Sequence, residues 1–219
     1  MKFDSRAIQI LRNFTSINPG ILFRPGNEVR TISTTRSIMA RATISTHIES
    51  QFAIYDLSQF LSAVTLFDSP DLVTKERSVV IESGAEKLEY FFTAPDNIMA
   101  APDKEVAVQD AVVNFTMKGD VFARLQKAIG IISVPEIAIT GEDGKIYLEG
   151  FNSKDSSKSF YRVEVGETDK SFRFIFSVEN VKLLAGDYEV SATSKGIGHF
   201  KGSDVEYWIA MESSSSYNG

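Results

Sequence analysis

Hydrophobic positions recur along this chain in two patterns, one typical of strands and one typical of helices. The segment Phe52–Phe67 contains both in succession, with an apolar run over Phe52–Tyr55, then Asp56, then apolar residues at helical spacing. Aspartate is a residue type that caps helix N-termini. The segment therefore predicts a buried strand that leads directly into a short amphipathic helix with an uncharged polar face.

The same order of elements recurs, and further amphipathic helices are predicted at Ser5–Ile17, Lys118–Ser133 and Ser177–Leu184. Three strands are predicted after each helix: near Gly20–Phe23, Val29–Ser33 and Ile38–Ser45; Asp71–Lys75, Ser78–Glu82 and Lys87–Thr93; Glu136–Thr140, Lys145–Gly150 and Ser159–Val165; and Asp187–Thr193, Gly198–Lys201 and Val205–Met211. Val108–Met117 and Ser171–Phe176 are predicted to be strands as well. Four helix-plus-three-strand units indicate an α+β fold with the helices on one face of the sheets.

The segment Ala94–Glu105 interrupts this pattern, because it holds Pro95 and Pro102 among small and acidic residues and has no periodicity. It is interpreted as an interdomain linker, and a long surface loop within one domain is the alternative. The linker reading gives an N-terminal domain at 1–93, a linker at 94–105, a C-terminal domain at 106–212 and a disordered polar tail at 213–219.

The composition of the chain excludes several kinds of binding and catalytic site. The 219 residues include no cysteine, which excludes disulfides and thiolate metal sites, and only two histidines, His47 and His199. Neither a phosphate-binding glycine loop nor a nucleophile elbow is present, so we expect no cofactor and no catalytic site. No apolar run approaches the ~18 residues of a membrane span, and the polar helix pattern after Met1 predicts no secretory signal.

Charge is distributed unevenly, although the net charge is −6. Residues 1–17 carry Lys2, Arg6 and Arg12 against Asp4, and residues 118–133 carry three cations against Asp120. Neither helix has the Glu partners that usually support solvated helices at i,i+4. The basic faces suit either a DNA backbone bound without sequence preference or simply a solvated surface built from good helix formers.

The chain resembles the DNA sliding clamps, the polymerase processivity factors, of T-even-type bacteriophages. The stretches that carry the resemblance occur in order along the sequence: FTSINPGILF (14–23), FAIYDLSQFL (52–61), EIAITGEDGKIYLEGFN (136–152), FIFSVENVKLLAGDYEV (174–190) and VEYWIAMES (205–213). Residues 68–105 match poorly. The resemblance implies a non-enzymatic protein of two domains, three copies of which join head to tail into a ring.

In that family the helices line the hole, and the ring encircles double-stranded DNA and tethers the replicative DNA polymerase. An ATP-dependent clamp loader places the ring on DNA, some members act with the transcription machinery, and the location implied is the cytoplasm of the infected bacterial host. By analogy the DNA-facing residues are Lys2, Arg6, Arg12, Lys118, Arg124, Lys127 and Lys182.

The resemblance also implies two protein-binding surfaces. Partner peptides would dock between the linker and the final strand, at Ile98, Met99, Trp208, Ala210 and Met211. A tryptophan is a common interface anchor, but Trp208 is equally compatible with the core. Subunits would pair through edge strands that include Leu88, Tyr90, Phe92, Phe160 and Arg162, unless both edges are covered within the chain.

Two other functions are compatible with the sequence. A β-rich viral structural protein would also assemble symmetrically, without tethering anything to DNA. A two-domain hydrolase with an unrecognised carboxylate site is the third reading. The mass of the assembly distinguishes the first two, and turnover of generic esters, glycosides and phosphates tests the third.

Overall fold

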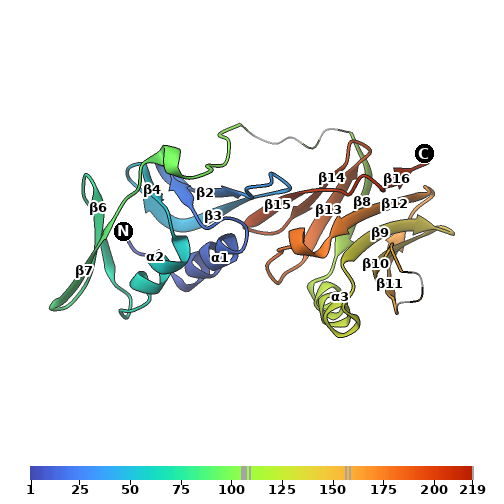
Figure 1. Ribbon diagram of the computed structural model, residues 1–219, viewed down its shortest axis with the longest axis horizontal. Coiled ribbons are helices and arrows are strands. Elements are labelled where there is room, and N and C mark those ends of the chain that lie inside the picture. Colours follow the sequence, from blue (N-terminus) through green and yellow to red (C-terminus); the bar gives the residue numbers. More distant parts are fainter. Residues whose placement is uncertain (105–107, 109, 156, 158, 219) are drawn as a thin grey trace. The chain divides into compact units, whose positions relative to one another are not determined.

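The structure is a computed structural model that describes residues 1–104, 108, 110–155, 157 and 159–218 (Figure 1). The chain divides into two compact units, Met1–Lys104 and Glu105–Gly219. The end of the expected linker at Glu105 and the start of the expected second domain at 106 lie outside the described residues.

The first unit contains two α-helices and seven strands among its residues. In chain order they are α1 (Ser5–Thr15), β1 (Ile21–Phe23), β2 (Gly26–Ile32), β3 (Ile38–Ile48), β4 (Phe52–Ile54), α2 (Leu57–Val64), β5 (Asp71–Thr74), β6 (Ser78–Ser83) and β7 (Glu86–Phe91). Antiparallel pairs join β1 to β4, β2 to β3, and β5 to β6 to β7. The two helices pack against each other, α1 also contacts β3, and α2 contacts β7.

Local sequence explains why α2 begins where it does. The Asp56 carboxylate accepts a hydrogen bond from the Gln59 N–H at 2.8 Å, as expected of an N-cap. The apolar side of α2 then packs into an aromatic cluster centred on Phe23, which is fully buried. Phe23 lies 4.8 Å from the ring of Phe52 and 6.4 Å from that of Phe60, between centroids. This cluster fixes the strand-to-helix segment that the sequence predicted.

Asp4 caps α1, because its Oδ1 accepts the Ala7 N–H at 2.7 Å while its Oδ2 accepts the Ser45 hydroxyl at 2.7 Å. These bonds, the one to Ala7 most strongly, lower the pKa of Asp4 below its ordinary 3.8. The charged cap therefore stabilises the fold above the unfolded-state pKa, and this contribution is lost as the pH falls through the lower folded-state value.

We predict that Asp4→Ala lowers the free energy of unfolding by about 1 kcal/mol, measured by denaturant titration at neutral pH. Asp4→Asn can still cap the helix but cannot titrate, so it should retain most of the stability and flatten its dependence on pH below 3.8. An unchanged acid dependence in Asp4→Asn would assign the pH effect to other carboxylates.

The second unit has one α-helix and nine strands among its described residues. They are β8 (Ala111–Met117), α3 (Gly119–Ile132), β9 (Glu136–Glu142), β10 (Lys145–Phe151), β11 (Tyr161–Glu167), β12 (Phe172–Ser177), β13 (Tyr188–Thr193), β14 (Ile197–Lys201), β15 (Val205–Ala210) and β16 (Ser216–Tyr217). One sheet has the order β11-β10-β9-β12-β16, and β15, β14, β13 and β8 are neighbours in another.

The hairpin of β9 and β10 turns at Asp143 and Gly144, which both have positive φ, at 52° and 79°. Two consecutive positive φ values match the twist that a two-residue hairpin loop requires. The helix α3 covers β10 and β11. It lies so close that a Cβ on Gly150 would stand 2.6 Å from the Ile129 side chain, which places Gly150 on the helix-facing side of the sheet.

The fourth predicted helix is wrong. Only Val178–Asn180 form a helical turn, of the 3₁₀ type, and the side chain of Ser177 does not cap it. Downstream, the Leu184 N–H donates to the Tyr207 hydroxyl at 3.2 Å, and the Leu184 carbonyl accepts from the Tyr188 hydroxyl at 2.7 Å. These backbone groups bond to tyrosines of the sheet instead of to helical neighbours, so a continuous helix does not form.

The predicted disorder of residues 213–219 is also wrong for the part that is described. Ser216–Tyr217 form β16 and pair with β12, and the Tyr217 ring stacks on Phe174 with the ring planes 16° apart. The Asn218 N–H bonds to the Ser171 carbonyl at 3.0 Å. The open edge of β12 supplies the backbone partners that a polar sequence alone does not reveal.

Candidate nucleic-acid interface

Arg12 is the exposed cation of α1. It lies on the side of the helix opposite the buried residues Leu11 and Phe14, and it makes no ion pair with any described residue. It also lines a shallow hollow of about 520 Å³ between α1 and the segment that follows α2. Arg6, on the same helix, is half-buried and donates to the Gln9 side chain at 2.7 Å. Arg12 is thus the more available of the two for a phosphate.

The polar face of α3 carries Arg124 and Lys127, both exposed. Arg124 forms an i,i+4 ion pair with Asp120, at 3.1 Å between Nη2 and Oδ2. Within the described parts of the chain, Lys127 has no ion-pair partner. Asp120, the acid that the sequence places among the cations of residues 118–133, thus neutralises Arg124.

Lys118 is held at the start of α3 by a residue that lies far away in sequence. Asp187 accepts the Gly119 N–H at 2.8 Å through Oδ1 and bonds the Lys118 ammonium at 2.8 Å through Oδ2. The hydrogen bond between the two side chains raises the pKa of Lys118 and lowers the pKa of Asp187, so both remain charged. Asp187 therefore supplies the capping acceptor that the Lys118 side chain cannot provide.

Lys2 and Lys182 do not fit the expectation of unpaired cations on helix faces. Lys2 pairs with Asp71 at 3.4 Å, with both side chains more than half exposed. Lys182 is half-buried and follows the 3₁₀ turn, so it does not lie on a helix. The expectation of uncompensated cations is therefore wrong for Lys2, Lys118 and Arg124. Exposed pairs of this kind are weak and exchange readily with other partners.

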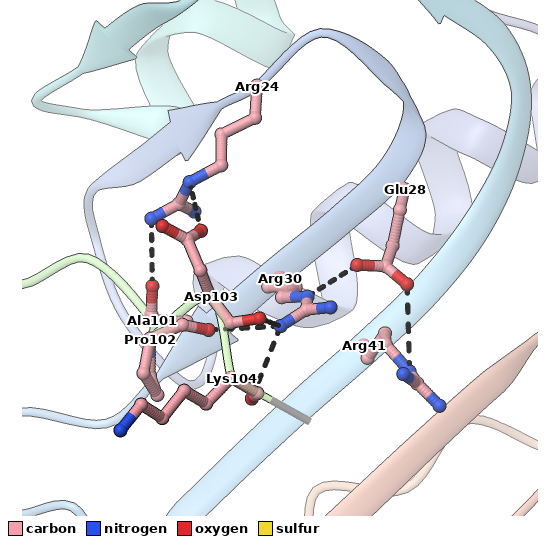
Figure 2. A network of polar contacts seen from close by, with 8 residues as sticks. All are labelled: Arg24, Glu28, Arg30, Arg41, Ala101, Pro102, Asp103 and Lys104. Carbon is pink, nitrogen blue, oxygen red and sulfur yellow. Dashed lines mark hydrogen bonds and ion pairs between the residues drawn. The ribbon is translucent and has the colours of Figure 1, made fainter. Parts of the chain in front are cut away.

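A second feature is the segment Ile98–Lys104, here called the strap, which two arginines bind to the first unit (Figure 2). Arg24 pairs with the Asp103 carboxylate at 2.7 Å and donates to the Ala101 carbonyl at 3.0 Å. Arg30 donates to the carbonyls of Pro102 and Asp103, at 3.1 and 2.7 Å. Glu28 in turn pairs with Arg30 and, at 3.8 Å, with Arg41.

The other end of the strap holds the predicted pocket residues Ile98 and Met99, both half-buried. The Asn18 side chain, itself buried, donates to the Met99 carbonyl at 3.0 Å. Ile98 packs so closely on Gly20 that a Cβ there would lie 2.7 Å from its side chain. The sequence singled out none of the anchors Asn18, Arg24 and Arg30, because each contacts a segment more than 70 residues away.

The remaining pocket residues lie on and after β15. Trp208 is only 6% exposed, and its ring stacks on His199 with the centroids 4.8 Å apart. The His199 Nε2 is 2.9 Å from the Glu206 carboxylate. Ala210 and Met211 are half-buried. The strap belongs to the first unit and β15 to the second.

The predicted subunit-interface residues lie at the ends of two sheets. Leu88 and Tyr90 are on β7, the last strand of β5-β6-β7, and Phe92 follows it. Phe160 and Arg162 precede and lie on β11, the outermost strand of the five-stranded sheet. Among the described residues, β7 pairs in register only with β6, and β11 only with β10. Within the described residues, each unit thus has a sheet whose outermost strand is paired on one side only: β7 in the first unit and β11 in the second.

Comparison with known proteins identifies the family. Residues 4–99 match the family model "DNA polymerase processivity factor", and residues 114–213 match "gp45 sliding clamp, C terminal". The sliding clamp of Vibrio phage KVP40 is 33% identical over 97% of this chain and 99% of its own length. The chain belongs to the phage sliding-clamp family. The sliding clamp of Escherichia phage RB69 is 30% identical over the full length of both chains.

Solved structures show the same fold. The PCNA of Thermococcus kodakaraensis superposes with a TM-score of 0.71, covering 97% of this chain and 99% of its own at 15% identity. The expected two-domain α+β sliding-clamp fold is confirmed, as is the resemblance drawn from the sequence. The protein is a DNA polymerase processivity factor that associates with DNA, and this role is not enzymatic. No helix in the described residues is long and apolar enough to span a membrane.

Proposed function

We propose that three copies of this sliding clamp join head to tail into a ring that encircles duplex DNA and holds the polymerase at the primer end. The proposal rests on one observation, that each unit has an edge strand, β7 in the first unit and β11 in the second. Two different edges on one chain favour a heterologous, head-to-tail contact, and such contacts close into a ring when the rotation between copies permits it. A polymerase bound to the ring stays on the same DNA molecule, so its effective concentration at the primer end is high.

The DNA-facing surface in this proposal consists of the polar faces of α1 and α3. Arg12 and Lys127 supply available positive charge, and the ion pairs of Lys2, Lys118 and Arg124 can exchange an acidic partner for a phosphate. Contacts of this kind carry no sequence information. A sparse set of weak contacts also allows the ring to slide, whereas tight phosphate contacts would hold it in place.

Partner proteins would dock by a short apolar peptide, and the proposed contact residues are Ile98 and Met99 in the first unit and Trp208, Ala210 and Met211 in the second. The strap supports this proposal because its carbonyls are held in place by Asn18, Arg24 and Arg30, so its apolar side chains are presented in a defined position. Methionine adapts to differently shaped partners. We expect the polymerase and an ATP-dependent clamp loader to compete for this site, in the cytoplasm of the infected bacterium, and the transcription machinery is a further candidate partner.

Primer extension on a long single-stranded circular template tests the function. With a phage replicative polymerase, its clamp loader, ATP and a heparin trap that limits each polymerase to one binding event, adding the clamp should lengthen the products by at least about tenfold, because the tether raises effective concentration. The matched control omits ATP, which prevents loading.

Products of equal length with and without the clamp would contradict the proposal. Light scattering then tests the viral structural alternative: a closed ring has three times the 24.2 kDa mass of one chain, whereas a structural protein would form larger or open assemblies.

A further inference from the structure

One face of the strands β14 and β15 changes from apolar to charged along its length. Three cross-strand pairs follow one another on this face: Ile197 with Ala210, His199 with Trp208, and Lys201 with Glu206. The residues between them point to the opposite face, because side chains alternate along a strand. Phe200 is buried there, with its ring centroid 5.9 Å from that of Phe176. The pair of His199 and Trp208 therefore separates the apolar end of the face from the charged end.

The imidazole of His199 covers the indole of Trp208. The two ring planes are only 13° apart and the centroids are 4.8 Å apart, which is the geometry of a stacked pair. Trp208 is almost completely buried, although it lies on the same face as the exposed Lys201. A ring in this position cannot turn without losing the contact, so the stack restricts the orientation of the indole.

Glu206 in turn holds the imidazole. The His199 Nε2 is the nitrogen that donates to the carboxylate, because a carboxylate only accepts hydrogen bonds. The side chains of His199 and Glu206 are 15% and 19% exposed. Hydrogen bonds are stronger in such a partly dry environment than in water. The plane of the Trp208 indole is thus set by a chain of contacts that begins at Glu206.

The apolar end of this face remains accessible. Ile197 is 36% exposed, and Ala210 and Met211 are half-buried. The Met211 N–H donates to the Gly196 carbonyl at 2.8 Å, which holds Met211 at this end of the hairpin. Two of the proposed docking residues therefore lie in an apolar strip that also includes Ile197, and Trp208 borders this strip.

We propose that His199 is a positioning residue of the docking surface: anchored by Glu206, it fixes the plane of the Trp208 indole against which an apolar partner peptide packs. The inference rests on the proposed docking of partner peptides at Trp208, Ala210 and Met211. A side chain that is already ordered loses less conformational freedom when a partner binds. Removing the imidazole should therefore weaken partner binding even though His199 itself does not contact the peptide.

The affinity of the full-length clamp for the immobilised phage replicative polymerase tests this role. His199→Ala removes the stack and should weaken binding by about fivefold. His199→Phe keeps a flat ring over the indole, so it should bind within about twofold of the unchanged chain. His47→Ala is the matched control, because His47 is the other histidine and is exposed on β3; it should have no effect. A loss in His199→Phe as large as that in His199→Ala would contradict a role through stacking.

Met211→Glu separates the positioning role from the docking surface itself. A carboxylate in the apolar strip would have to be buried by the peptide, so binding should weaken by at least about tenfold. Weak binding by Met211→Glu together with unchanged binding by His199→Ala would overturn the role of His199 and leave the docking surface in place. Unchanged binding by both variants, each with a native circular dichroism spectrum, would overturn the docking surface as well.

The fluorescence of the clamp alone tests the contact directly, since Trp208 is the only tryptophan in the sequence. A protonated imidazole in contact with an indole quenches its emission. We expect a single decrease in emission as the pH falls between about 8 and 5, the range in which histidine gains its proton. The decrease should be absent in His199→Phe and unchanged in His47→Ala. A decrease that persists in His199→Phe would contradict the stack.

Glu206→Gln tests the anchor. A carboxylate favours the protonated imidazole, so this variant should move the midpoint of the fluorescence change to lower pH by roughly one unit. The other charged groups on this face of β13, β14 and β15 are Glu189 and Lys201, which lie opposite each other and offset one another. An unchanged midpoint in Glu206→Gln would contradict the anchoring of His199 by Glu206.

Discussion

Replacing Arg6, Arg12, Arg124 and Lys127 together by alanine is expected to reduce clamp loading and polymerase stimulation by at least about tenfold near physiological salt, because phosphate contacts supply most of non-specific DNA affinity. The trimer should remain intact, since none of the four residues lies on the edge strands β7 and β11. The measurements are the loading rate on primed circular DNA and the mass in solution. Loss of the trimer would show that these residues are structural.

The structure predicts that the four residues contribute unequally. Arg124 is already paired with Asp120, and Arg6 is half-buried against Gln9. The double variant of Arg12 and Lys127 should therefore reproduce most of the loss and should lower the slope of binding against salt.

The matched control for that double variant removes two exposed lysines from loops, Lys154 and Lys195, and changes the net charge by the same amount. It should leave loading nearly unchanged. Equal losses in the two double variants would mean that overall charge, rather than the helix faces, determines loading.

Local patterns predicted most of the fold. Asp56 and the apolar spacing after it define α2, and Asp143-Gly144 defines the turn between β9 and β10, because in both cases the deciding contacts lie within a few residues. The helices α1 and α3 were predictable for the same reason, since a helix buries one face at a fixed period.

Contacts between distant segments account for what the sequence missed. The helix expected at Ser177–Leu184 is replaced by bonds to Tyr188 and Tyr207, and the tail is ordered by the edge of β12. The same holds for the candidate site. Asp187 neutralises Lys118 from 69 residues away, and Arg30 reaches the strap carbonyls more than 70 residues on. A single sequence does not specify such pairs, although its charges show which residues could form them.

The strap and the edge strands together suggest how one chain can serve two protein contacts independently. The strap is fixed by Asn18, Arg24 and Arg30, whereas the proposed subunit contact uses β7 and β11. Within the first unit these two sets of residues are distinct. In the proposed ring, exchange of a partner at the strap therefore does not require the proposed subunit contact to open.

Retention on circular DNA tests the central claim, that the protein is held by encirclement and not by affinity. The clamp is loaded on nicked circles, the salt is raised to a level at which a binder held by phosphate contacts loses about 10³–10⁵ in affinity, and the DNA is then cut once. We predict that the clamp stays on the intact circles and leaves within the dead time of the experiment once the DNA is linear. Equal release rates from circular and linear DNA would contradict the topological mechanism.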